Sequence, residues 1–152
     1  MDRTRRRENT TLITKKIFFD GFDVTSSRFV DHDNSDVEGG RFNVDFTELK
    51  FTAEKESEEL QYIYLETVAI LKAYNGLSTE EYLDENLAFE CDVSLSLVFK
   101  YLSDKELTNE EFESNLWFFE NYISLSGKLA LESLLKNTMI ETIKLPWHRK
   151  IT

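Results

Sequence analysis

Alternating hydrophobic and polar positions predict a β-strand over residues 87–101. Every odd position from Phe89 to Tyr101 is apolar or aromatic, whereas the even positions are polar apart from Val98. Because successive side chains of a strand point to opposite faces, this strand has one buried and one solvent-facing side. Such a strand is typical of an antiparallel sheet that is covered on one side only.

Three further strands are predicted before it. β-branched and aromatic residues predict a strand over Leu12–Asp23, with a bulge or bend at Gly21. The alternation over Arg41–Lys55 changes parity, which predicts a bulge near Thr47–Glu48 that keeps one face buried. Leu60–Tyr74 is apolar on both parities, as expected for a central strand or for one covered by a partner subunit.

The connections between these strands predict their order. The last three strands follow one another closely, which predicts an antiparallel meander. Val24–Gly40 is polar and rich in turn formers, so we expect a long loop after the first strand. Leu77–Asn86 is an acidic excursion between the last two strands.

The hydrophobic period changes from that of a strand to that of a helix after the last strand. Thr108 and Glu111 have the spacing of a capping box, and the apolar positions that follow predict a helix. We expect a break around Gly127 and a second helical stretch over Leu129–Met139. This stretch is apolar most of the way round, which predicts a homo-oligomer interface. The expected interface residues are Leu129, Leu131, Leu134 and Leu135.

Composition and charge narrow the possible functions. The 152 residues are 41% hydrophobic and 13% aromatic, which predicts a folded chain with one core. The net charge is −11, the opposite sign to a typical nucleic-acid-binding domain, so we expect no nucleic-acid partner. There is neither an apolar run of roughly 18 residues nor the apolar segment of a signal peptide. We therefore expect a cytosolic protein without a membrane partner.

The domain boundaries are predicted from the positions where the hydrophobic periodicity begins and ends. Residues 1–10 have no periodicity and carry four arginines among the first seven positions. A flexible basic tail is expected there, and an arm that touches an acidic partner or RNA is the alternative. Residues 11–147 are expected to form a single domain, followed by a short tail over 148–152.

No residue pattern indicates catalysis. His32 and His148 have no motif around them, and the acidic residues occur in solvated runs. Cys91 is the only cysteine and lies on the apolar parity of its strand, as expected for an inert buried thiol. We therefore expect no enzyme, no cofactor and no metal. A third hypothesis is an enzyme that uses Cys91 or an acid pair. Reaction of the Cys91 thiol with a thiol reagent under native conditions would support it.

Two acids stand out on the polar parity of the last strand. Glu90 and Asp92 lie about 7 Å apart by strand geometry. They are either part of a solvated face that discourages edge pairing or a docking patch for a basic partner. Both interpretations stay open on spacing alone.

Two segments resemble the SecB family of export chaperones. Ala88–Val93 is similar to the family's aromatic-x-Cys-acid-Val stretch, and Ser124–Thr142 with Leu145-Pro146 is similar to its main helix and the extended segment that follows. The resemblance covers roughly residues 12–147. It implies an α+β fold: a four-stranded antiparallel sheet with a long crossover after the first strand, covered by a long C-terminal helix. It also implies a homotetramer built as a dimer of dimers.

Several positions match the family and others depart from it. Asp92 matches an acid that helps to dock the SecA motor, and Asp20 is similar to another. Glu90 stands where the family has a leucine and Lys16 where a further acid is usual, which weighs against SecA binding. The chain stops at Thr152, so the last helix of the family is expected to be missing or reduced. These departures resemble the SecB-like chaperones that protect an aggregation-prone antitoxin of a toxin–antitoxin pair.

The resemblance implies an ATP-independent holding chaperone for an unfolded or extended client. An export precursor and one dedicated antitoxin are both open as clients. The residues expected to line the client groove are Phe18, Phe22, Phe29, Tyr62, Tyr64 and Trp147, for each of which core packing is the alternative. The acidic docking patch comprises Asp20, Glu90 and Asp92. The competing function is an α+β adaptor that holds one folded basic partner on this acidic face.

Overall fold

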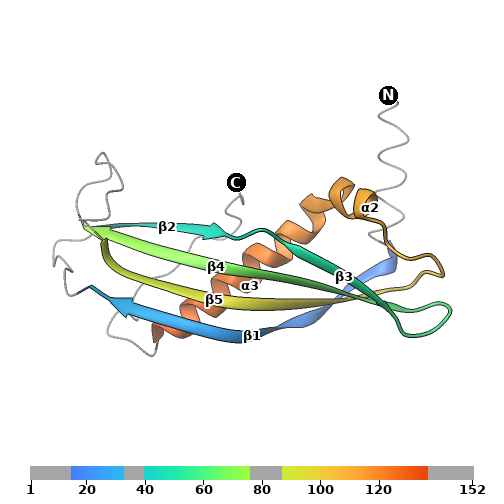
Figure 1. The fold of residues 1–152 in the computed structure, drawn as a ribbon, viewed down its shortest axis with the longest axis horizontal. Coiled ribbons are helices and arrows are strands. Elements are labelled where there is room, and N and C mark those ends of the chain that lie inside the picture. The colour runs from blue at the N-terminus through green and yellow to red at the C-terminus, as the bar shows by residue number, and fades with distance from the viewer. Residues whose placement is uncertain (1–14, 33–39, 76–86, 137–152) are drawn as a thin grey trace, which may run out of the picture.

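The computed structural model describes residues 15–32, 40–75 and 87–136, which form an antiparallel sheet with α3 against one face (Figure 1). The predicted α+β class and the covering C-terminal helix are confirmed. The strands are β1 (Ile17–Asp31), β2 (Gly40–Phe46), β3 (Lys50–Lys55), β4 (Gln61–Asn75) and β5 (Leu87–Tyr101). The helices are α2 (Asn109–Ser114) and α3 (Leu116–Lys136). None of the described helices is long and apolar enough to cross a membrane.

The strand order is β1-β5-β4-β2, with β3 also paired to β4. All pairs are antiparallel, so the predicted meander is confirmed for the part of the sheet from β2 through β4 to β5. The sheet has five strands rather than the four expected, because the predicted strand Arg41–Lys55 is interrupted at Thr47–Leu49. Both halves of that strand pair with β4 and therefore occupy one position in the sheet.

The interruption between β2 and β3 keeps one face of the edge strand buried, as the change of parity predicted. Phe46 pairs with Ala69 on one side of it, and Phe51 pairs with Leu65 on the other. Ala69 and Leu65 are both buried on the α3 side of β4. Apolar residues of opposite parity therefore reach the same face.

Thr47 keeps the edge of β4 hydrogen-bonded across the interruption. Its amide donates to the carbonyl oxygen of Val68 at 2.9 Å, and its hydroxyl accepts from the Val68 amide at 2.9 Å. The Thr67 hydroxyl donates to the Thr47 carbonyl oxygen at 3.0 Å. The backbone of β4 therefore stays paired where the regular ladder stops.

The prediction of a long loop over Val24–Gly40 is wrong for the first part of that range, because β1 continues to Asp31. Six consecutive residues where the predicted strand meets this part, Asp23–Arg28, are exposed, so both faces are wet and no alternation marks a strand. The pairing with β5 holds the segment in place, with the Ser26 hydroxyl donating to the Ser94 hydroxyl at 2.9 Å. Residues 33–39 of the expected loop, the acidic excursion and both tails lie outside the described residues.

The predicted bulge at Gly21 is confirmed. Phe19 pairs with Phe99 and Gly21 pairs with Val98, which leaves Asp20 as the extra residue. Gly21 has a φ of 125°, a conformation that side chains with a Cβ rarely adopt.

The capping box at the start of α2 is also confirmed. The Thr108 hydroxyl accepts from the Glu111 amide at 3.1 Å, and the Thr108 amide donates to Oε1 of Glu111 at 3.4 Å. Both groups satisfy backbone donors that the helix leaves free.

The helix break expected around Gly127 is wrong, since α3 runs unbroken for 21 residues. Gly127 faces the sheet, and a Cβ on it would lie 2.7 Å from the ring of Phe46. The glycine therefore allows α3 to pack closely on the edge strand. The free energy gained by this packing outweighs the low helix propensity of glycine.

A buried glutamine fastens the loop between β5 and α2. Gln61 is 1% exposed, and its Nε2 donates to the carbonyl oxygens of Ser103 (3.1 Å) and Lys105. Its Oε1 accepts from the Leu107 amide at 3.4 Å. One side chain thus satisfies three backbone groups of the loop that carries the chain from the sheet to the helices.

We expect the Gln61→Leu substitution to lower the free energy of unfolding by about 2–4 kcal/mol, because it leaves three loop backbone groups without their partner. The measurement is equilibrium urea unfolding followed by circular dichroism. Lys55→Gln is the matched control, because Lys55 pairs with Gln61 across the strands but is exposed. A loss below about 1 kcal/mol in Gln61→Leu would contradict the anchoring role.

Candidate functional site

The face of the sheet away from α3, which we name the outer face, has no described helix or strand packed on it (Figure 1). Even-numbered residues of β4 from Tyr62 to Lys72 and of β5 from Glu90 to Lys100 point to it, while the odd-numbered ones form the core under α3. At the other end of these strands Tyr74 and Ala88 are buried. The outer face of β5 is mostly polar, as its alternation predicted. Apolar side chains gather at one end of it.

The outer apolar cluster consists of Phe18, Tyr62, Tyr64, Val98 and Leu102. Phe18 and Tyr62 both pair with Lys100, and Tyr64 pairs with Val98, so β1, β5 and β4 all contribute. Leu102 continues the same side one step beyond β5. Phe18 and Leu102 are 51% and 50% exposed, and the tyrosine rings lie 6.5 Å apart. Exposed apolar groups gathered in this way are typical of an interaction surface.

The charge around the outer apolar cluster is negative. Glu54 pairs with Tyr62 across the strands, and burial together with the carboxylates of Glu54 and Glu56 raises the pKa of Tyr64. Lys100, in the middle of the cluster, lies 3.7 Å from Asp20. The cluster is therefore an apolar surface with an acidic rim.

The structure brings together three of the six residues predicted to bind client and separates two others. Phe18, Tyr62 and Tyr64 meet on the outer face. Phe22 and Phe29 point to the α3 side, where they are half-buried and pack against the core. Trp147 lies outside the described residues.

The bulge at Asp20 explains this separation. Phe18 and Phe22 have the same parity in the sequence, so a regular strand would put both on one face. The extra residue shifts the alternation, and Phe22 pairs with buried Leu97 while Phe18 pairs with Lys100.

Sequence reasoning missed two members of the outer apolar cluster, Val98 and Leu102. Val98 had a signal, because it is the only apolar residue on the polar parity of its strand between Phe89 and Tyr101. Leu102 follows the end of the periodic stretch, where alternation no longer assigns a face.

The three acids predicted to form a docking patch each have a basic side chain beside them. Oδ2 of Asp92 lies 3.0 Å from Nε of Arg28, and Oε1 of Glu90 lies 3.4 Å from Nε2 of His32. Asp20 faces Lys100, as described above. Two of the pairs join β1 to β5, and His32 directly follows β1. Exposed pairs of this kind add little stability, but they reduce the net negative charge that a basic partner would meet.

The leucines predicted to form an oligomer interface have different surroundings. Leu131 and Leu135 are buried in the core of this chain, and Leu134 is half-buried against it. Leu129 is 44% exposed. Trp117, near the start of α3, is 52% exposed, so Leu129 and Trp117 are large apolar side chains that α3 leaves at the surface of the described structure.

The Cys91 thiol is buried in the core, at 1% exposure. Burial, with smaller contributions from Asp92 and Glu90, raises its pKa to about 12. Only the thiolate is a good nucleophile, so almost none of the reactive form exists near neutral pH. Within the described ranges, histidine, cysteine and acidic side chains form no group of three that could hold a metal ion.

We expect Cys91 to resist a thiol reagent such as dithionitrobenzoate at pH 8 in the folded protein and to react within seconds after unfolding in guanidinium. The reason is that both access and ionisation are blocked in the core. The rate should rise with pH only as the solution approaches the raised pKa of about 12. Rapid stoichiometric reaction of the folded protein would contradict this.

Comparisons with known proteins show the fold. No protein-family model matches the sequence, and no curated protein is detectably similar to it. Among solved structures, the Mycobacterium tuberculosis SecB-like chaperone Rv1957, in complex with a ChAD peptide from the HigA1 antitoxin, matches with a TM-score of 0.65 and 10% identity. The match covers 93% of this chain and 98% of that one. A Streptococcus agalactiae protein of unknown function matches with a TM-score of 0.46 and 11% identity, over 87% and 98%. The chain therefore has the fold of a SecB-like chaperone.

Proposed function

We propose that this protein is an ATP-independent holding chaperone that binds an unfolded or extended client. The observation that carries the proposal is the outer apolar cluster, where half-exposed Phe18 lies on one side of Lys100 and Tyr62 on the other, and where half-exposed Leu102 follows the end of β5. A fold shared with a chaperone that binds an antitoxin peptide supports the same function.

The size of the cluster sets the strength of binding. Full burial of an apolar side chain contributes about 1.5–3 kcal/mol, and Phe18 and Leu102 are already half-buried. After the cost of ordering a flexible client, a few such contacts support only micromolar affinity per site. A client held this weakly dissociates without ATP, which suits a holding function.

Backbone pairing can add to these contacts. Among the described strands, β1 pairs only with β5, so its other edge has free backbone donors and acceptors. An extended client can add a strand to such an edge. Phe18 lies on β1, so a client paired there is next to the cluster.

The client, the assembly and the location are part of the same proposal. A dedicated antitoxin fits the structural match better than an export precursor, since the matching chaperone was solved with an antitoxin peptide. We propose a cytosolic dimer of dimers in which Leu129 and Trp117 of α3 contact another subunit. We do not extend the proposal to SecA or to a folded basic partner, because Arg28 and Lys100 offset two of the acids that such partners would need.

The test is suppression of aggregation. A guanidinium-unfolded protein is diluted into buffer with a stoichiometric amount of the purified chain, and light scattering is followed without nucleotide. We expect the chain to reduce light scattering to a small fraction of that seen with an equal mass of serum albumin. Unchanged scattering at a severalfold excess of the chain would contradict the proposed function.

A further inference from the structure

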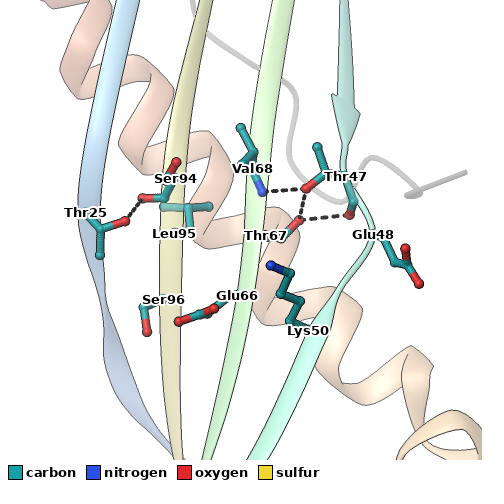
Figure 2. A pocket seen from close by; sticks show the side chains of 10 residues that line it. All are labelled: Thr25, Thr47, Glu48, Lys50, Glu66, Thr67, Val68, Ser94, Leu95 and Ser96. Atoms are coloured by element: carbon teal, nitrogen blue, oxygen red, sulfur yellow. Dashed lines mark hydrogen bonds between the residues drawn. The ribbon is translucent and has the colours of Figure 1, made fainter.

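A polar hollow of about 310 Å³ lies on the face of the sheet away from α3 (Figure 2). Its lining is mostly hydroxyl-bearing or charged: Thr25, Thr47, Glu48, Lys50, Glu66, Thr67, Val68, Ser94, Leu95 and Ser96. We name it the hydroxyl hollow. Glu66 and Ser96 are a cross-strand pair, and each lies two residues along its strand from the paired Tyr64 and Val98 of the cluster. This volume is at the low end of the range for a small-ligand site.

Three features of the sheet create the hydroxyl hollow. Ser94 and Ser96 have small side chains, so they leave space above the outer face of β5 at this point. On one side, the register of β1 shifts between Val24 and Ser26, which leaves Thr25 as an extra residue. On the other side, the edge strand is interrupted at Thr47–Leu49. The depression therefore comes from the backbone and does not depend on one side-chain rotamer.

Some of the polar groups in the hydroxyl hollow already bond one another. The Thr25 hydroxyl donates to the Ser94 carbonyl oxygen at 3.3 Å, and the Ser94 hydroxyl accepts from Ser26. Thr47 and Thr67 bond each other on the opposite side. These groups form the walls of the hollow.

Other groups remain available to a ligand. Lys50 and Glu66 are cross-strand neighbours, yet they make no ion pair with each other. Within the described part of the chain, Lys50, Glu66 and the Ser96 hydroxyl have no hydrogen-bond partner. A donor ammonium, an acceptor carboxylate and a hydroxyl that can do either thus line one small space.

We propose that the hydroxyl hollow binds the carboxamide side chain of an asparagine or glutamine in the client. A carboxamide has an acceptor oxygen for Lys50 or Ser96 and a donor NH₂ for Glu66. A basic side chain offers a donor to Glu66 but no acceptor to Lys50, and an acidic one offers an acceptor to Lys50 but meets Glu66 and Glu48. This inference rests on the proposed function, because it assigns the residue that accompanies the apolar anchor.

The spacing of the two sites defines the client pattern. Same-face residues of a strand lie about 7 Å apart, which is the spacing from Tyr64 to Glu66. A client lying extended along β4 and β5 therefore has an aromatic or aliphatic residue on the outer apolar cluster and the carboxamide two residues away.

The test uses four fluorescein-labelled peptides of ten residues, each with one phenylalanine, and with glutamine, glutamate, lysine or leucine two residues after it. Binding to the full chain is measured by fluorescence anisotropy at 0.15 M salt. One or two added hydrogen bonds predict that the glutamine peptide binds about five- to tenfold more tightly than the glutamate and lysine peptides. The double variant Ser96→Val, Glu66→Leu should lose this preference and keep its affinity for the leucine peptide. Lys72→Leu, on the outer face of β4 outside the hollow, should keep the preference.

The outcomes separate this inference from the proposed function. Equal affinity for all four peptides, or tightest binding of the glutamate or lysine peptide, overturns the carboxamide site and leaves the chaperone proposal standing. A preference for glutamine that persists in the double variant also overturns it. If none of the peptides binds, the proposed function fails and this inference fails with it. Circular dichroism and urea unfolding confirm that each variant is folded.

Discussion

Replacing Phe99 with alanine is expected to lower the free energy of unfolding by about 3–5 kcal/mol. Phe99 is 0% exposed and lies where β1, β5 and α3 meet. Its ring centroid lies 5.3 Å from that of Phe19, 5.1 Å from Phe119 and 5.5 Å from Tyr122. The substitution therefore leaves a cavity that several aromatic rings border, and rigid rings collapse into such a space poorly.

The matched control is Phe18→Ala, which lies on the outer face and is next in sequence to Phe19, the cross-strand partner of Phe99. Phe18 is half exposed, so its loss is expected to cost less than about 1 kcal/mol. Urea unfolding of both variants and the parent gives the comparison. If Phe18→Ala were as destabilising as Phe99→Ala, the outer apolar cluster would be part of the core and not a surface available for binding.

The second large effect concerns binding. We expect the double substitution Phe18→Ser, Tyr62→Ser to weaken binding of an unfolded client at least about tenfold, because it removes both aromatic rings that flank Lys100. Stability should change little, since neither side chain belongs to the core. The measurement is a titration of a labelled unfolded protein followed by fluorescence anisotropy.

Trp117→Ser is the matched control for that experiment. Trp117 is as exposed as Phe18, at 52% against 51%, but it lies on α3, on the other side of the sheet. It should therefore retain client binding, while a change in subunit contacts is expected from it. Loss of client binding in Trp117→Ser and retention in the double variant would place the client on the α3 side instead.

The fold could be predicted where burial differs between two faces. The alternation over residues 87–101 defined a central strand, and the change of parity near Thr47 located the interruption of the edge strand. The second half of β1 could not be recognised, because Asp23–Arg28 is wet on both sides. The helix break expected at Gly127 was wrong for a different reason. A glycine is needed there because α3 packs closely on Phe46, and this tertiary contact cannot be recognised from the hydrophobic pattern of the helix.

The candidate site was predicted only in part. The resemblance to the SecB family and the aromatic character of the residues pointed to Phe18 and Tyr62, but they could not separate these from Phe22, which the bulge at Asp20 turns to the core side. The acidic patch was visible in the spacing of Glu90 and Asp92. Their basic partners come from β1 through long-range pairing, which spacing within one strand does not reveal.

Binding of an unfolded protein but not of its folded form is the central claim. Sedimentation velocity tests it most directly, with the chain mixed with a small labelled disulfide protein in its native form or in a reduced, alkylated form that stays unfolded. The account predicts that only the unfolded form co-sediments with the chain, without ATP, and that the Phe18→Ser, Tyr62→Ser variant loses this complex. Co-sedimentation of the native form alone, or of neither form at concentrations of tens of micromolar, would contradict it.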